Sequence, residues 1–328
     1  MASRDADWRA PRLRSALSAP PQRGRVYLSH HRDSRRWDAY RPRSSDVIIS
    51  TASKSGTTWM QRIMSLLVFG PGDLPDSLLR ISACLDQWFQ GDLDEEIARI
   101  EAQEHRRFLK AHLPLDGLPY FPEIRYINVG RDTRDVFMSV WNHYGSYTEA
   151  MLERLSQSPT GEPLPPCPEN VRDFWRLWMT TGTYPWEDDG YPFGSPNAHA
   201  TSFWEHRHLP NILMVHYNDM KADLEGEMRR VAAFCGIEVP DEAWPAIVEG
   251  ARFETMKRDA AKLVPGTARA FKGGVGTFIY KGTGGRWRDV LTDSDLDLYD
   301  EMANRLDPAL RKWLEGGRVV AGEPSEAK

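Results

Sequence analysis

A short polar turn near the start of the chain has the residue types that bind an anion. It follows a β-branched run at residues 47–49 and precedes an apolar pattern of helical spacing at residues 59–67. A glycine lets backbone N–H groups approach an anion, hydroxyls at a helix N-terminus donate to it, and a lysine adds charge. The turn therefore predicts a strand, an anion-binding loop and a helix. Its candidate residues are Lys54, Ser55, Gly56, Thr57 and Thr58.

This turn differs from the phosphate-binding loop of nucleoside triphosphatases. That loop reads GxxxxGK[ST], whereas here Lys54 precedes Gly56 and no glycine stands five residues before Gly56. An ordinary strand–helix turn with an N-capping threonine is the other interpretation, and the turn alone does not decide between them.

Five motifs, taken together, resemble the cytosolic sulfotransferase family. KSGTTW resembles that family's 5′-phosphosulfate loop, FLKAHLP at 108–114 its catalytic-base stretch, and GRDTRDVFMSVWNHY at 130–144 its 3′-phosphate segment. ILMVHYNDMK at 212–221 resembles a strand end of the family, and YKGTGGRWRDVLT at 280–292 its closing loop. The motifs cover roughly residues 45–316. The resemblance implies that 3′-phosphoadenosine 5′-phosphosulfate (PAPS) is the sulfuryl donor.

The resemblance implies three catalytic residues. Sulfuryl transfer leaves growing negative charge on the bridging oxygen, so by analogy with phosphoryl transfer catalysis requires positioning and cations. Lys54 is expected at the leaving oxygen and Lys110 at the transferring group. His112 is the candidate general base, since imidazole titrates near working pH; a hydrogen-bonded structural histidine is the alternative. No paired acids flank the turn, so we expect no metal cofactor.

A second implied group holds the donor's 3′-phosphate. Arg131 offers a planar fork for phosphate, and Ser139 follows eight positions on, which is about two helical turns. Lys281 and Gly282 are expected to close over the phosphate from the last loop. The family's arginine at the start of this loop is Tyr280 here, so one 3′-phosphate contact is expected to be missing.

Aromatic residues are expected around adenine and the acceptor. The resemblance implies adenine contacts by Trp59, Tyr217 and Phe253, although Trp59 and Phe253 alone would be interpreted as core residues. Four further aromatic residues either line the acceptor pocket or pack in the core, and the sequence does not separate these cases. They are Trp88, Phe89, Tyr144 and Tyr147.

The sequence predicts no metal site, and it leaves the oligomeric state and the identity of the acceptor open. His199, His206, His208 and His216 cluster in sequence, but no acid or cysteine completes a ligand set, so no metal site is predicted. The family's usual dimer motif is not recognisable in KLVPGTARAFKGGVG, so the oligomeric state stays open. Family members act on phenols, steroids, alcohols, amines and lipids. We expect a small-molecule acceptor with a hydroxyl or amine, of unknown identity.

Composition excludes several classes of protein. The chain has 328 residues, a net charge of −5 and 41% hydrophobic residues. It is not an electrostatic match for nucleic acid, and no apolar run reaches the roughly 18 residues of a membrane span. Three distant cysteines without a CxxC pair favour a reducing compartment, so we expect a cytoplasmic protein.

Apolar runs that alternate with helical patterns predict the fold class. We expect an α/β fold with a P-loop-like, doubly wound parallel sheet flanked by helices, in a single domain. Such sheets bind ligands at the carboxyl ends of their strands. Further strands are expected at 107–110, 125–129 and 211–215. Helices are expected at 94–106, 132–144, 169–180, 223–235 and 293–306.

The ends of the chain differ in composition from the middle. Residues 1–44 are rich in arginine and poor in acids, which predicts a partly flexible arm, with an organelle transit peptide as the other interpretation. Residues 45–316 are expected to form the sulfotransferase domain, and residues 317–328 a disordered tail.

Two functions besides sulfuryl transfer stay open on the sequence. One is a nucleotide kinase or other phosphoryl transferase with a similar loop, although the lysine-before-glycine order argues against it. The other is a non-catalytic binder of PAPS or its desulfated product, against which the presence of Lys54, Lys110 and His112 argues.

Overall fold

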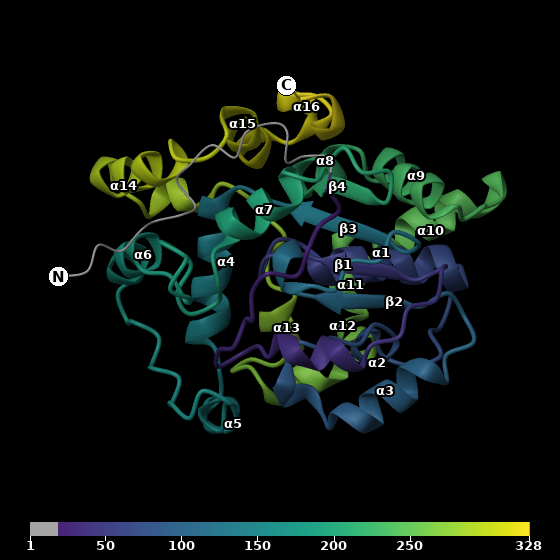
Figure 1. The fold of residues 1–328 in the computed structure, drawn as a ribbon, viewed down its shortest axis with the longest axis horizontal. Helices are drawn as coiled ribbons and strands as arrows, with labels where there is room; N and C mark the ends of the chain where they lie inside the picture. The colour runs from purple at the N-terminus through teal and green to yellow at the C-terminus, as the bar shows by residue number, and fades with distance from the viewer. Residues whose placement is uncertain (1–18, 328) are drawn as a thin grey trace.

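Four short parallel strands form the centre of the molecule (Figure 1). The computed structural model describes residues 19–327. The strands are β1 (Val47–Ser50), β2 (Phe108–Ala111), β3 (Arg125–Gly130) and β4 (Ile212–His216), in the order β2-β1-β3-β4. Each strand lies within a residue or two of its predicted place, so the α/β fold with a parallel sheet is confirmed.

The sheet is doubly wound about β1. The chain passes from β1 to β2 on one side, then crosses to β3 and β4 on the other. Direct pairing of β1 with both β2 and β3 brings their carboxyl ends side by side, with Ser50 opposite Ala111 and Asn128. In open sheets of this kind the ligand crevice lies where the winding direction changes. The residues that follow these strand ends are therefore the first candidates for a site.

Alternate side chains of each strand enter two separate cores. Val47 and Ile49 pack with helices α1 (Thr57–Phe69), α9 (Leu224–Cys235) and α10 (Trp244–Ala251). Residues at the intervening positions face the opposite core, which includes helices α7 (Pro196–Trp204) and α15 (Pro308–Gly316). This alternation is the period-two pattern of a strand buried on both faces.

A third core lies beside the sheet and carries the predicted segment at 132–144. It contains α4 (Thr133–Gly145), α6 (Val171–Thr180) and α14 (Asp293–Ala303). Side-chain caps begin these helices, and Thr292 and Asp295 form a capping box at α14. The remaining helices are α2 (Leu78–Ile81), α3 (Leu93–Glu101), α5 (Glu149–Ser156), α8 (Tyr217–Ala222), α11 (Phe253–Arg258), α12 (Ala260–Leu263), α13 (Val275–Phe278) and α16 (Arg318–Ala321).

The described part of the N-terminal arm packs against the core. Tyr27, Trp37 and Tyr40 are at most 3% exposed, and the Tyr40 hydroxyl donates to Asp46 Oδ2 at 2.5 Å. Aromatic side chains between the arginines thus anchor residues 19–44 of the predicted partly flexible arm. Residues 1–18 of the predicted arm lie outside the described residues.

Residues 318–327 of the predicted disordered tail contact the rest of the chain. Residues 318–321 form α16, and Arg318 donates from its backbone to Asp219 Oδ2 at 2.7 Å and from its side chain to Glu227 at 2.6 Å. Arg207 donates to the carbonyl groups of Pro324 and Ala327. These charge-assisted contacts give the segment partners that its composition did not indicate.

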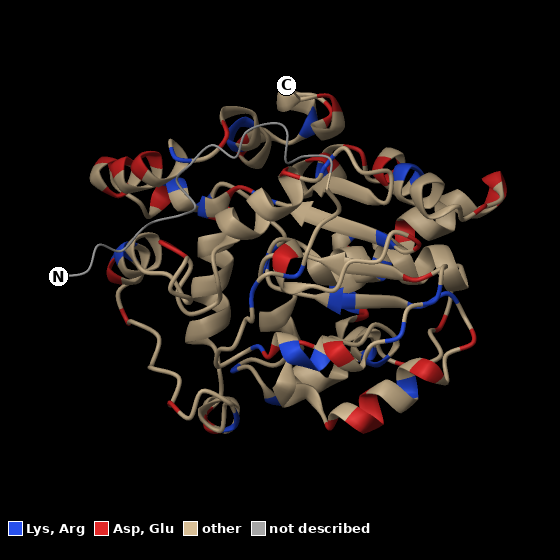
Figure 2. Ribbon diagram, in the orientation of Figure 1, with Lys and Arg blue, Asp and Glu red and all other residues tan. Residues whose placement is uncertain are grey.

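Charged residues lie mostly on the outer helices and loops (Figure 2). The four strands contain two basic residues, Lys110 and Arg125, and no acidic residue. Lys110 is 7% exposed, and burial of a lysine in a sheet costs free energy unless its charge is paired. Within residues 19–327 the helices are too short or too polar to cross a bilayer.

We predict that a buried ion pair fixes the amino end of the sheet. Arg107 and Asp46 have fully buried side chains, and Arg107 Nε donates to Asp46 Oδ1 at 2.9 Å. Asp46→Ala removes the buried acid and leaves Arg107 only the partly exposed Glu101 as an ion-pair partner, so it should cost roughly 3–5 kcal/mol in the free energy of unfolding. Urea unfolding measures this loss.

The control for this prediction is an exposed pair on α9. Arg229 and Glu225 are separated by 2.9 Å and are both about half exposed, so Glu225→Gln should leave the midpoint of urea unfolding nearly unchanged. An equally small loss for Asp46→Ala would show that the buried pair does not stabilise the fold.

Candidate functional site

A cavity of about 1240 Å³ opens at the carboxyl ends of the strands. It is lined from the turn after β1 by Lys54, from β2 by Lys110 and His112, from the turn after β3 by Arg131, and from the end of β4 by Tyr217. The parallel sheet therefore brings together residues that are up to 163 positions apart, as the position of ligand sites in doubly wound sheets predicts.

The turn between β1 and α1 has the backbone of an anion-binding loop. Lys54 has a positive φ of 69° and Gly56 a φ of 120°. A Cβ on Gly56 would lie 3.1 Å from the Tyr217 ring, so both conformation and space require glycine there. Helix α1 begins directly afterwards, at Thr57. Its first-turn N–H groups and its dipole therefore point towards the cavity.

The predicted side chains of this turn do not all face the cavity. Lys54, Gly56, Thr57 and Thr58 line it. Thr57 also makes a hydroxyl–hydroxyl hydrogen bond with Thr51. Ser55 is 2% exposed, its backbone N–H donates to the Ala52 carbonyl at 3.2 Å, and it is absent from the lining. Ser55 is thus the residue of the predicted anion-binding turn that does not line the cavity.

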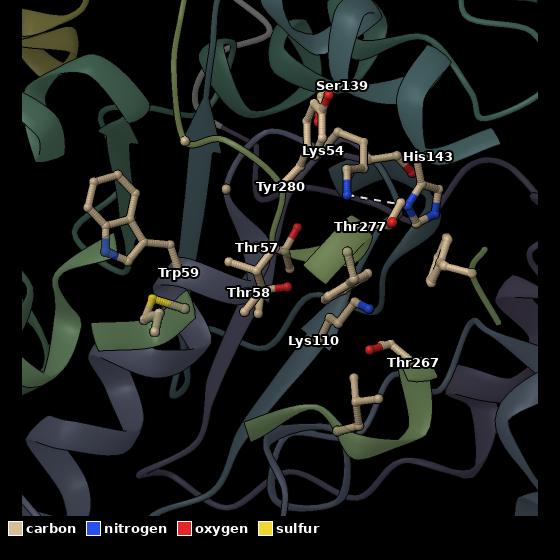
Figure 3. Close-up of a pocket in the computed structure, with 18 of the residues that line it drawn as sticks. Lys54, Thr57, Thr58, Trp59, Lys110, Ser139, His143, Thr267, Thr277 and Tyr280 are labelled. Carbon is tan, nitrogen blue, oxygen red and sulfur yellow. Dashed lines mark hydrogen bonds between the residues drawn. The ribbon is translucent and has the colours of Figure 1, made fainter. Parts of the chain in front are cut away.

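The surroundings of Lys54 lower the pKa of its ammonium group. Burial, followed by the charges of Arg131 and Lys110, lowers its pKa to about 7. Its Nζ lies 3.3 Å from Nδ1 of His143, a contact drawn in Figure 3. Burial and the charge of Lys54 keep the pKa of His143 well below its usual range, so the imidazole accepts the hydrogen bond from the ammonium.

Lys110 and His112 enter the cavity from the end of β2. The Nζ of Lys110 donates to Gln87 Oε1 at 3.2 Å, and Figure 3 shows this side chain and that of Lys54 on either side of Thr57 and Thr58. His112 Nδ1 lies 2.9 Å from the carbonyl oxygen of Thr51. A carbonyl only accepts, so Nδ1 carries the proton and Nε2 has the free lone pair.

The surroundings of His112 keep its ring neutral. Its backbone N–H donates to the buried carboxylate of Asp86 at 3.1 Å, which fixes the strand end. Burial, then the positive charges of Lys110 and Arg32, hold the pKa of His112 well below its usual range. The imidazole is therefore a proton acceptor, and not an acid, across neutral pH.

The predicted 3′-phosphate residues lie around one corner of the cavity. Arg131 is 7% exposed, and its guanidinium lies 4.1 Å from the Tyr217 ring centroid. Ser139 and Lys281 line the same cavity. Gly282 has a φ of 64°, and a Cβ there would lie 2.6 Å from the Phe253 ring, so the last loop runs directly against this aromatic residue.

The three predicted adenine contacts form an aromatic corner. Trp59, Tyr217 and Phe253 all line the cavity. The Trp59 and Tyr217 rings are 5.3 Å apart at 69°, and Trp59 Nε1 donates to the Ala251 carbonyl at 2.8 Å. The fixed indole and the nearby rings give flat faces on which a base could stack.

The other end of the cavity is an aromatic chamber. Of the four undecided aromatic residues, Phe89 and Tyr147 line it. Trp88 instead donates to the His30 carbonyl at 3.0 Å, and the Tyr144 hydroxyl donates to the Pro165 carbonyl. The chamber also contains residues that the sequence did not indicate: His31, His143, Phe193, Phe271 and Phe278.

Arg32 is a further cavity residue that sequence reasoning missed. It is 4% exposed and donates to Ser53 Oγ at 3.0 Å, directly before Lys54. It lies in the arginine-rich arm, which the composition suggested to be solvated. The aromatic residues of that arm, Tyr27, Trp37 and Tyr40, were the sequence signal that could have placed it in the core.

The structure separates the histidines considered for a metal. His199 Nε2 contacts Ser50 Oγ at 3.2 Å, and His216 Nε2 donates to the Leu314 carbonyl at 3.0 Å. Across residues 19–327, no group of three or more His, Cys, Asp or Glu side chains is placed to hold a metal ion.

Comparison with known proteins gives one consistent family. The family model described as "Sulfotransferase domain" matches residues 44–315. A glycolipid sulfotransferase of Mycobacterium bovis is 34% identical over 89% of this chain and 94% of its own length. Sulfotransferase 1A1 of Rattus norvegicus is 26% identical, over 78% and 82% of the two chains.

Two solved structures share the fold. Mouse sulfotransferase SULT7A1 complexed with PAP has a TM-score of 0.61 and 23% identity, over 82% of this chain and 86% of its own. Retinol dehydratase in a complex with retinol and PAP also has a TM-score of 0.61 and 23% identity, over 82% and 83%. At this identity the likeness concerns the arrangement of the chain.

We predict that binding of an anion at the turn takes up a proton. Because the pKa of Lys54 is about 7 in the empty site, the side chain is mostly neutral at about pH 8, and a bound phosphate would raise its pKa. Affinity should therefore fall as pH rises above 7. Calorimetry with adenosine 3′,5′-bisphosphate in two buffers of different ionisation enthalpy should show uptake of nearly one proton.

The control is Lys54→Arg, whose guanidinium stays charged at this pH. It should bind the same nucleotide without proton uptake. Equal heats for the wild type in both buffers would contradict the lowered pKa of Lys54.

Proposed function

The chain belongs to the PAPS-dependent sulfotransferase family, and we propose that it moves the sulfuryl group of PAPS to a hydroxyl or amine of a small-molecule acceptor. His112 acts as the general base in an in-line attack. The observation that carries this proposal is the fixed tautomer of His112, whose Nδ1 proton is held by the Thr51 carbonyl at 2.9 Å. Its Nε2 is thereby left with a lone pair at the cavity.

In this proposal the base acts first on the acceptor. Nε2 of His112 accepts the acceptor's proton while the oxygen attacks sulfur, because an alcohol or phenol is a weak nucleophile until it is deprotonated. The bond between sulfur and the bridging oxygen breaks, and the bisphosphate leaves with that oxygen. A neutral imidazole is required at the start, which the lowered pKa of His112 supports.

The lysines have separate electrostatic roles. Lys54, in the turn that would hold the 5′-phosphosulfate, stabilises the charge that grows on the leaving oxygen. Lys110 stabilises the transferring group from the neighbouring strand. The coulombic effect of Lys110 on the pKa of Lys54 supports their proximity, and cations placed where charge develops give the largest catalytic effect in transfers of this kind.

The cavity residues fit the charge and shape of the donor. Backbone groups of Gly56, Thr57 and Thr58 at the start of α1 would hold the phosphosulfate. Arg131 has a buried Nε without a hydrogen-bond partner within the described chain, which an additional anion at this corner would help to satisfy. Ser55, buried below the turn, would support the loop through its backbone.

The acceptor is proposed to enter the aromatic chamber. The glycolipid sulfotransferase of Mycobacterium bovis acts, by name, on glycolipids, and retinol dehydratase is described in complexes with retinol and with androsterone. Rings of Phe89, Tyr147, Phe193 and Phe271 would pack on the apolar part of such a molecule. Its hydroxyl would then face His112.

We predict that His112→Ala abolishes transfer while the nucleotide still binds. Loss of a general base lowers the rate at least about a hundredfold, whereas His112 is not among the proposed nucleotide contacts. The rate is measured with labelled PAPS and an acceptor chosen from a panel of phenols, sterols, alcohols, amines and glycolipids. Nucleotide affinity is measured by calorimetry.

The matched control is His199→Ala, since His199 is equally buried but contacts Ser50 and Asn128 behind the strands. It should lower stability without removing the chemical step. Near-normal turnover by the His112→Ala variant would exclude His112 as the base.

We also predict that turnover needs no divalent metal. The lysine pair supplies the positive charge that magnesium supplies in kinases, and no acid stands beside the turn in the sequence. Activity with labelled PAPS should persist after exhaustive chelation. Loss of activity that magnesium restores would instead favour phosphoryl-transfer chemistry.

A further inference from the structure

Two arginines line the cavity without a carboxylate as an ion-pair partner in the described part of the chain. Arg131 follows β3, and Arg286 begins the 3-10 helix η7 (Arg286–Asp289) in the last loop. Both line the cavity. Their side-chain hydrogen bonds go to backbone carbonyl groups: Arg131 to Lys54 at 3.1 Å and to Thr283 at 3.4 Å, and Arg286 to Met138 at 3.3 Å. Neither forms a salt bridge within residues 19–327.

The two guanidinium groups are close enough to repel each other. Burial lowers the pKa of Arg286, and the charge of Arg131 is the next cause. Like charges that share a partly desolvated site destabilise each other unless an anion lies between them. Such an arrangement costs stability in the empty protein and favours a ligand that carries negative charge.

A neighbouring arginine shows the opposite arrangement. Arg134, three residues after Arg131, is paired with Asp132 at 2.7 Å and lies 4.2 Å from the centroid of the Trp287 ring. Asp132 at the start of α4 thus neutralises Arg134, whose role is structural. Arg131 and Arg286 lack such a partner.

The nearest acid does not neutralise the pair. Asp135 interacts with both arginines, since it raises the pKa of Arg286 and Arg131 is the largest charge acting on it, but one carboxylate balances only one of two guanidinium groups. Its Oδ1 accepts a hydrogen bond from the Gly285 backbone at 2.6 Å, and its pKa is raised by burial. Asp135 therefore fixes the turn before Arg286 and leaves the positive charge in excess.

Unused donors point to the same corner. Nε of Arg131 is buried without a hydrogen-bond partner among residues 19–327. Ser139 lines the cavity, and its hydroxyl has no side-chain partner in the part of the chain that the structure describes. Ser139 follows Met138, whose carbonyl receives Arg286. A guanidinium fork, a hydroxyl and a second guanidinium are the donors that recognise a phosphate.

We propose that Arg286 supplies a contact to the donor's 3′-phosphate that Tyr280 does not supply. Tyr280 stands where the family has an arginine and carries no charge. Its ring centroid lies 5.4 Å from the Arg286 guanidinium, so the tyrosine packs against the residue that would supply the missing charge. Arg286 and Arg131 both bind the phosphate, and Ser139 of α4 is the third donor, since all three residues line the cavity. This inference rests on PAPS as the proposed donor.

The test compares two nucleotides that differ in the 3′-phosphate. Calorimetry gives the dissociation constants of adenosine 3′,5′-bisphosphate and adenosine 5′-monophosphate for the wild type, Arg286→Ala, Arg286→Lys and Arg288→Ala. We expect Arg286→Ala to weaken bisphosphate binding roughly ten- to a hundredfold and to leave the monophosphate nearly unchanged. Arg286→Lys should retain part of the preference, because it keeps the charge but loses the fork.

Arg288→Ala is the matched control. Arg288 lies two residues further on, is exposed and contacts the Trp287 ring at 4.4 Å outside the cavity lining, so its removal should leave both affinities unchanged. Unchanged monophosphate affinity in Arg286→Ala also shows that the site is folded.

Two results separate this inference from the proposed function. If the wild type prefers the bisphosphate and Arg286→Ala keeps that preference, or loses both nucleotides equally, Arg286 does not bind the 3′-phosphate. If the wild type itself shows no preference between the two nucleotides, the proposed donor is wrong, and with it the basis for this assignment.

Discussion

The structure has to hold several positive charges together at one edge of a buried sheet. Lys54, Lys110 and Arg131 lie at or just after the carboxyl ends of three adjacent strands, and burial together with the charges of Arg131 and Lys110 lowers the pKa of Lys54. Mutual repulsion of this kind would push flexible loops apart. Here the strands are fixed by two apolar cores, and the opposite end of the sheet is held by the buried pair of Arg107 and Asp46. The ion pair thus stabilises the amino end of the sheet. At the carboxyl end, cations without an acidic partner in the described chain favour the binding of an anion.

The elements that could be predicted from sequence are those whose cause is local. The run at 47–49, the glycine turn and the helical spacing after Trp59 depend on neighbours in the chain, and strand, loop and helix all follow there. Lys54, Lys110, His112 and Arg131 were placed by motifs, and the parallel sheet brings them together. Ser55 is buried in the turn and does not line the cavity. Residue type alone does not determine this.

The features that sequence did not predict depend on contacts between distant segments. Arg32 and His31 were assigned to a solvated arm, yet they form cavity wall because Tyr27 and Trp37 anchor that arm. His143 was part of a recognised motif, but its contact with Lys54 is set by the loop geometry across 89 positions. The aromatic chamber combines the arm, α4 and the segment from Phe271 to Phe278, so no single stretch of sequence describes it.

The charge excess also links the two halves of the proposed reaction. Burial and the charges of Lys110 and Arg32 lower the pKa of His112 and so weaken it as a base. A donor that binds as proposed brings several negative charges to Lys54, Lys110 and Arg131 and so neutralises part of the charge that acts on the imidazole. The basicity of His112 would then rise when the donor is present. The residues that bind the donor would therefore also determine when the base is ready for the acceptor, without any movement of the sheet.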